Sequence, residues 1–195
     1  MAFFKNFNRK IILASGSPRR QQLFHLLFDK FEVKVSAIDE HLKPGMTPEE
    51  IVRELAVDKA KAVADDEQNA MIFGADSVVV VDHQILGKPT TAAEATQMLQ
   101  MLSGKKHEVF TGFSIVDKPT ENIFTNYTVT QVHFRNLSRE EIQRYIEVGN
   151  PFDKAGAYGI QDEAAVFISG ITGCYYNVMG LPVSDVYQAF LKFHP

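Results

Sequence analysis

Hydrophobic and polar residues follow two patterns along this chain, one typical of strands and the other typical of helices. Residues 11–14 form a short apolar run that Ser-Gly-Ser-Pro ends, which predicts a buried strand followed by a turn. A helix should follow, because Ser17 suits the N-cap and Pro18 the first helical position, and leucines then recur at helical spacing. The chain therefore begins with a predicted strand–helix unit.

Three more helix starts are predicted by capping boxes, in which an N-cap hydroxyl and an acidic residue three positions later satisfy each other's backbone donors. The pairs are Thr47 with Glu50, Thr91 with Glu94, and Ser138 with Glu141. The Gly-Asn-Pro run at residues 149–151 should end the last of these helices, and residues 183–193 have the pattern of a final amphipathic helix.

Apolar or β-branched runs of strand length lie between the helices. They cover residues 31–37, 71–73 with 77–81, 108–116, 123–134 and 164–168, and residues 82–84 should turn a hairpin. Strand–helix units mixed with hairpins predict an α/β fold with a mixed, twisted sheet and flanking helices. Residues 1–10 lack the continuous apolar stretch of a signal peptide, and we expect them to form a frayed lead-in segment.

Composition narrows the class of protein. The 195 residues are 45% hydrophobic and no Pro/Gly/Ser-rich stretch divides them, so we expect a single domain over residues 1–195. The net charge of −4 argues against a broad surface for nucleic acid or an anionic membrane, and no segment approaches the roughly 18 uninterrupted apolar residues of a membrane span. The single cysteine, Cys174, fits a reducing, cytoplasmic compartment.

The strongest chemical signal lies at the first predicted helix start, in the sequence Ser15-Gly-Ser-Pro-Arg19-Arg20. Free backbone N–H groups and the helix dipole make such a terminus an anion site. Two arginines in a first turn oppose that dipole unless an anion compensates, and their placement relative to Leu23 and Leu27 turns them toward the protein. These features favour phosphate binding, and the alternative is that both arginines extend into solvent or pair with carboxylates.

Two charged residues lie where apolar residues are expected. Lys59 falls within the apolar stripe of the helix that Thr47 begins, so it needs a charged partner, either a ligand phosphate or a carboxylate such as Glu40. Asp76 interrupts an apolar strand, and a buried acid needs a cation, a metal or a reacting proton. Asp76 is the candidate catalytic carboxylate, and the alternative is a turn aspartate that bonds the local backbone.

Two further segments give weaker signals. Lys88 lies between a glycine and a proline that would fix the backbone presenting it, although loop lysines are usually just solvated. Residues 153–161 are rich in small side chains and end in Gln161, whose amide can match the O4 acceptor and N3–H donor of uracil or thymine. The alternative for this segment is a Gly-rich turn with a surface glutamine.

Together these segments resemble the Maf family of nucleotide pyrophosphatases in order and spacing, over about residues 11–193. They are SGSPRR, IDE at residues 38–40, Lys59, GADSVV, GKP, DKAGAYGIQ and NVMGLP. The DKAGAYGIQ form is similar to the dTTP/UTP pyrophosphatase branch of that family. Two departures stand out, because Ser77 replaces the usual threonine of this branch and Asp162-Glu163 replaces the Gly-rich pair that normally follows the glutamine.

The resemblance implies a single-domain α/β fold similar to inosine triphosphate pyrophosphatases, with a central nucleotide cleft. It implies hydrolysis of dTTP and UTP, or of modified pyrimidine nucleotides, to the monophosphate and pyrophosphate. It further implies Asp76 as the proton acceptor. The resemblance also implies that substrate is bound by Ser15, Arg19, Arg20, Lys59, Ser77, Lys88 and Gln161. Among these, Arg19, Ser77 and Gln161 lie where the family sets substrate choice.

A triphosphate carries about four negative charges, so Mg²⁺ or Mn²⁺ is expected as cofactor, with Glu40 and Asp76 as oxygen ligands. Asp76 could serve as base, as metal ligand or as both. The competing interpretation is a nucleotide-binding regulator of septum formation that needs no turnover. We expect a nucleoside triphosphate as partner. The sequence leaves the oligomeric state open between a monomer and a homodimer.

Overall fold

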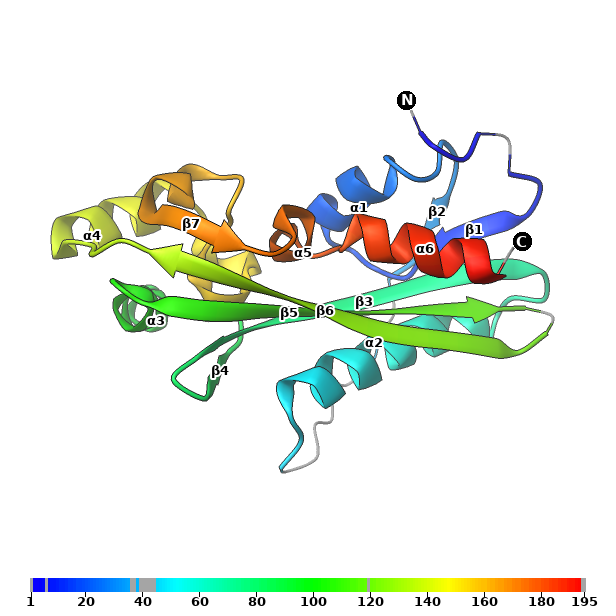
Figure 1. Ribbon diagram of the computed structural model, residues 1–195, viewed down its shortest axis with the longest axis horizontal. Helices are drawn as coiled ribbons and strands as arrows, with labels where there is room; N and C mark the ends of the chain where they lie inside the picture. Colours follow the sequence, from blue (N-terminus) through cyan, green and yellow to red (C-terminus); the bar gives the residue numbers. More distant parts are fainter. Residues whose placement is uncertain (1, 6, 36–37, 39–44, 119, 194–195) are drawn as a thin grey trace. The chain divides into compact units, whose positions relative to one another are not determined.

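The computed structural model describes residues 2–5, 7–35, 38, 45–118 and 120–193 (Figure 1). Its backbone contacts group into two compact units. The first comprises Met1–Asp76, Thr111–Thr128 and Gly180–Pro195, and the second comprises Ser77–Phe110 and Val129–Met179. Within the described residues, no helix combines the length and the apolar character needed to cross a bilayer.

The described strands form a mixed sheet in the order β2-β1-β3-β5-β6-β7, with β4 paired to β3. β1 (Lys10–Leu13) runs parallel to β2 (Glu32–Val33) and to β3 (Ala70–Val81). β4 (Gln84–Leu86) is antiparallel to β3, and β7 (Ile168–Thr172) is antiparallel to β6 (Asn122–Phe134). Strands β3, β5 (Lys106–Asp117) and β6 contribute residues to both units. A mixed sheet with flanking helices confirms the predicted fold class.

In the first unit, helices lie on both faces of the sheet (Figure 1). α1 (Pro18–Phe24) and α6 (Val183–Phe193) cover one face, and α2 (Pro48–Ala64) covers the other. Neighbouring strand residues face opposite sides, so the Phe73 ring of β3 meets Phe24 of α1 at a centroid distance of 5.0 Å, whereas Gly74 faces α2. This alternation determines which helix each residue of β3 meets.

Two glycines let the backbone of α2 touch the sheet. A Cβ added at Gly74 would lie 2.1 Å from the carbonyl oxygen of Ala56, and one at Gly112 of β5 would lie 2.1 Å from that of Val52. Any side chain at either position would push the helix away from the strands. The spacing between α2 and the sheet is therefore set by backbone atoms.

The second unit contains α3 (Ala92–Leu102), α4 (Arg139–Val148) and α5 (Tyr175–Met179), with short 3₁₀ turns at η1 (Pro151–Asp153), η2 (Ala155–Ala157) and η3 (Glu163–Phe167). α3 lies against α4 and η2. A ring cluster fills the core, in which His107 and Tyr158 both contact Phe134 edge-on.

The helix starts follow the predicted caps with one exception. Both halves of the capping box are present at Thr47 and at Ser138. At Thr91 only half of the box forms, because the carboxylate of Glu94 accepts from the backbone N–H and the hydroxyl of Thr90 instead. The reciprocal bond predicted there is wrong.

Two other predictions are corrected. The run at residues 164–168 is not a strand, since it forms η3 and the strand begins only at Ile168. The lead-in is packed rather than frayed, because the described residues Phe4 and Phe7 both contact Phe28 and Phe190. Phe4 also forms a parallel backbone bridge with Phe28. The N-terminal segment is therefore held to α6 and to Phe28, just beyond α1.

Candidate functional site

Lys59 and Asp76 form an ion pair in the first unit. Lys59 projects from α2, and Asp76 lies on β3 on the side that faces this helix. The side chains are 15% and 14% exposed, so water screens the pair only partly. β3 continues through Gly74–Ser77 without a break, so the alternative of a turn aspartate is wrong. Lys59 has the charged partner that its position required, and that partner is Asp76.

The start of α1 carries the predicted arginines. Ser17 caps the helix by accepting from the backbone N–H of Arg20, and Pro18 is the first helical residue, as predicted. The guanidinium of Arg20 donates from Nε to the carbonyl oxygen of Gly180 at 2.8 Å and from Nη1 to Ser15 Oγ at 3.3 Å. Arg20 thus joins the loop after β1 to the start of the segment that leads into α6. Arg19 lies partly exposed on the same turn.

The strand register brings these two groups near the carboxyl end of β1. β1 is parallel to β3, with Leu13 opposite Phe73, and the backbone N–H of Ala14 donates to the carbonyl oxygen of Phe73 at 2.8 Å. The loop that begins at Ser15 therefore leaves the sheet beside the stretch of β3 that carries Asp76. In open α/β sheets, ligands bind outside the carboxyl ends of such strands. A helix start, two arginines and a Lys–Asp pair thus lie near the carboxyl end of β1.

Ser77, Lys88 and Gln161 belong to the second unit. Ser77 follows Asp76 on β3, so the two side chains leave the strand on opposite sides. Lys88 is exposed beside Gly87, whose carbonyl oxygen accepts from the N–H of Gly156 at 2.9 Å. This bond joins the GKP segment to the DKAGAYGIQ segment. Gln161 lies in a turn and is partly exposed, as the alternative of a Gly-rich turn with a surface glutamine expects, and its Nε2 donates to Asp162 at 2.9 Å.

The predicted metal ligand Glu40 lies outside the described residues. Among those that are described, no group of three or more His, Cys, Asp or Glu side chains is placed to hold a metal ion. Asp76 is therefore the described part of the predicted ligand pair. Its carboxylate oxygens are the donor type that Mg²⁺ and Mn²⁺ prefer.

Sequence reasoning passed over Lys154, which lies in the DKAGAYGIQ segment. Its residue exposure is only 6%, and its ammonium donates to the carbonyl oxygen of Asn150 and to Asp153, each at 2.7 Å. Asp162 lies 3.4 Å from the same nitrogen. The available signal was a lysine surrounded by glycine and other small residues. Small side chains allow close approach to the backbone, so the lysine could have been expected to bond backbone carbonyl groups.

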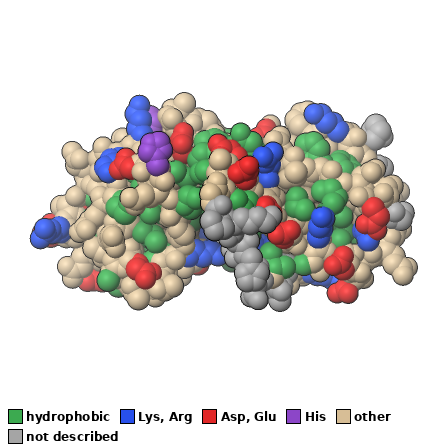
Figure 2. Space-filling view, turned by 90° about the horizontal axis from the view of Figure 1, so that it is seen from below, with side chains coloured by type: hydrophobic (Ala, Val, Ile, Leu, Met, Phe, Trp, Pro, Cys, Tyr) green, Lys and Arg blue, Asp and Glu red, His purple; other side chains and the backbone are tan. Residues whose placement is uncertain are grey.

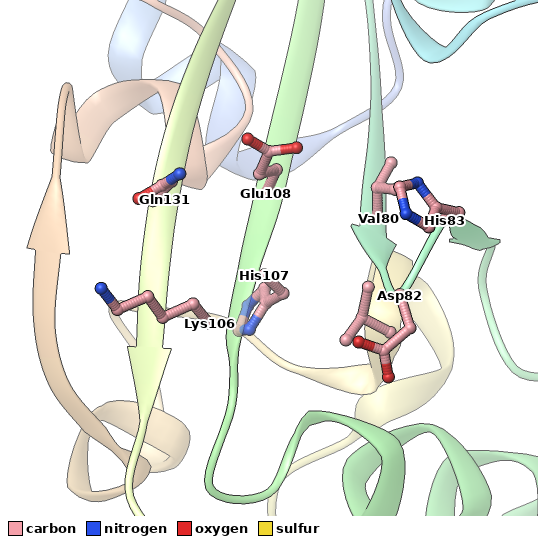
Figure 3. Close-up of a pocket in the computed structure, with 8 residues that line it drawn as sticks. Val80, Asp82, His83, Lys106, His107, Glu108 and Gln131 are labelled. Carbon is pink, nitrogen blue, oxygen red and sulfur yellow. The ribbon is translucent and has the colours of Figure 1, made fainter.

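A hollow of about 280 Å³ opens in the second unit (Figure 3). Asp82, His83, Lys106 and Glu108 are among its lining residues, which include none of those predicted for the site. Two acids against one lysine give no excess of positive charge, so this hollow is unsuited to a triphosphate. Figure 2 likewise shows charges of both signs scattered over the face it draws.

The fold and the first unit's charged groups define an α/β protein with two arginines in the first turn of α1 and a Lys–Asp ion pair between α2 and β3. The chain matches the family model described as Maf-like protein over residues 10–193. It belongs to the Maf family.

Proteins named dTTP/UTP pyrophosphatase are close relatives in sequence. The protein of that name from Desulforamulus reducens is 46% identical over 95% of this chain and 97% of its own length. The one from Bacillus cytotoxicus is 47% identical over 95% of this chain and 96% of its own length. The Ham1 protein structure from Staphylococcus aureus is similar in fold, with a TM-score of 0.51 at 15% identity, and the match covers 96% of this chain and 100% of that one.

Proposed function

We propose that this protein hydrolyses dTTP and UTP to the nucleoside monophosphate and pyrophosphate. The observation that carries the proposal is the largely buried Asp76, paired with Lys59 on the stretch of β3 beside the loop that leads into α1. The activity named for relatives that share 46% identity over almost the whole chain supports this choice of substrate. The cytoplasm, which holds the nucleoside triphosphate pool, is the proposed place of action.

In the proposed reaction, a water oxygen attacks the α-phosphorus and the bond from that phosphorus to the α–β bridging oxygen breaks. The proton of the attacking water passes to Asp76, and the electron pair of the broken bond leaves with pyrophosphate. Arg19, Arg20 and Lys59 neutralise phosphate charge. A phosphate that draws the ammonium of Lys59 away from Asp76 would leave the carboxylate free to accept the proton.

Mg²⁺ or Mn²⁺ fits the chemistry of the available donors, since a carboxylate is a hard oxygen ligand and such ions are commonly bound through one or two carboxylates plus substrate phosphates. We propose that Asp76 and Glu40 hold the ion. When bound, it would neutralise charge on the phosphates. Lys88 is proposed to contact the phosphates, and Ser77 and Gln161 are proposed to select the base.

The test is to incubate the purified protein with Mg²⁺ or Mn²⁺ and a panel of nucleoside triphosphates, and to resolve the products by ion-exchange chromatography. We expect UMP or dTMP with pyrophosphate in equal amounts, with much slower turnover of purine nucleotides. Orthophosphate with a nucleoside diphosphate would overturn the assigned bond. Tight nucleotide binding with no product would instead support the regulator.

A further inference from the structure

The side chain of Gln161 is held in one orientation. Its Nε2 donates to Asp162 Oδ1 at 2.9 Å, and this direction follows because an ionised carboxylate accepts hydrogen bonds and cannot donate them. Its Oε1 is covered from solvent and has no hydrogen-bond partner among the described residues. The group that remains for a ligand is the second N–H of the same amide nitrogen.

Asp162 is itself fixed on several sides. Its backbone N–H donates to the carbonyl oxygen of Gly159 at 3.2 Å, and its own carbonyl oxygen accepts from Ala165 at 2.9 Å. The buried ammonium of Lys154 lies 3.4 Å from Oδ2. Gly159 leaves room for the carboxylate, because a Cβ there would lie 2.3 Å from Oδ2. The acceptor that meets Gln161 therefore has a defined position.

We propose that Asp162 is a positioning residue for base selection, which holds Gln161 as a hydrogen-bond donor toward the base. This inference rests on the proposed function, in which Gln161 meets the base. Uracil and thymine carry a carbonyl oxygen at C4, which accepts from that donor. Cytosine carries an amino group at the same position, so two donors would meet. If Asp162 is removed, the amide can rotate and present its oxygen to cytosine.

The test compares kcat/KM for UTP and CTP, which differ at the C4 substituent and the N3 proton. Asp162→Ala should lower the UTP:CTP ratio about tenfold, which corresponds to about 1.4 kcal/mol. Asp162→Asn should keep the ratio within about twofold of the unchanged protein, because its Oδ1 still accepts from Gln161. An alanine fits this extended backbone, with φ −101° and ψ −161°.

A matched control separates positioning from charge. Glu163 is the exposed neighbour of Asp162, so Glu163→Gln removes the same charge without touching Gln161 and should leave the ratio unchanged. Gln161→Ala added to Asp162→Ala should lower the ratio no further, since Asp162 acts through Gln161. An unchanged ratio in Asp162→Ala, or an equal loss in Glu163→Gln, would overturn the proposal.

Binding of the product nucleotides keeps this test independent of turnover. Calorimetry with UMP and CMP should give the same tenfold change in the ratio of dissociation constants for Asp162→Ala. If the unchanged protein hydrolyses no triphosphate, the proposed function fails, and the UMP:CMP ratio still decides the role of Asp162. If the ratio of the UMP and CMP dissociation constants is identical in Asp162→Ala and the unchanged protein, the positioning role of Asp162 is wrong even in an active enzyme.

Discussion

Asp76 occupies a strand position that would ordinarily hold an apolar side chain, and Lys59 compensates its charge. Asp76→Asn keeps the shape of the side chain but removes the proton acceptor. We expect turnover of UTP to fall by about 10²–10⁴, the range typical of general acid–base catalysis. Steady-state kinetics on the variant measures this loss, and circular dichroism checks the fold.

The exposed Asp66 offers a control for the same chemical change. Asp66→Asn should retain full turnover. An Asp76→Asn variant as active as this control would remove Asp76 from catalysis.

The sequence was enough to predict that Lys59 needs a charged partner and that Asp76 needs a cation, a metal or a reacting proton. It could not pair them, because the contact depends on how α2 packs across β3. The two residues are separated by 16 others, and no periodic pattern within either element records that packing. Arg20 illustrates the same limit, since its bond to Gly180 joins distant parts of the chain.

His107 gives a pH-dependent stability. Burial lowers its pKa to about 4, and the nearby His133 adds to this effect. Between pH 6.5 and 4 the unfolded chain binds a proton at this residue and the folded protein does not, so stability is lost as the pH falls through that window. The shift corresponds to about 3 kcal/mol.

Urea denaturation at pH 7 and pH 4.5 should show a smaller loss of stability in His107→Gln than in the unchanged protein. The exposed His25 provides the control, because His25→Gln should keep the full pH dependence. Equal pH dependence in all three proteins would contradict the assignment to His107.

At the level of elements, the close approach of α2 to the sheet makes Gly112 sensitive to substitution. Gly112→Ala places a methyl group against the Val52 carbonyl oxygen, and we expect a loss of about 1–3 kcal/mol in the free energy of unfolding. Chemical denaturation measures this loss. Gly170→Ala on β7 is the control, since the nearest atom would lie 3.8 Å from the new Cβ. A stability equal to that control would show that α2 shifts without cost.

Periodicity and capping residues predicted most element types, because those signals are local. They placed α6 at residues 183–193 and the start of α2 at Pro48. They failed at residues 164–168, where a short apolar run suits a strand and a buried 3₁₀ turn equally well. They also missed the packing of Phe4 and Phe7, because that depends on ring contacts with α6 and with Phe28, just beyond α1.

At the scale of the whole molecule, three strands contribute residues to both compact units. Because β3, β5 and β6 each belong to both, we predict that the chain unfolds in a single transition, as one domain should. The chain contains no tryptophan, so single substitutions can report on each unit. The fluorescence of a tryptophan introduced by Tyr187→Trp reports the unfolding of the first unit, and that of Tyr176→Trp reports the unfolding of the second. Urea midpoints that differ between these two probes would contradict the single-domain prediction.

Because Gly74 has no side chain, its backbone sets how closely the helix that carries Lys59 can approach β3. How far an ammonium reaches is then governed by a residue that bears no functional group. A larger residue at position 74 would therefore change the distance between the lysine and its carboxylate while leaving both charged residues in the sequence. A substitution at Gly74 during evolution would change the activity even though no reactive side chain had been replaced.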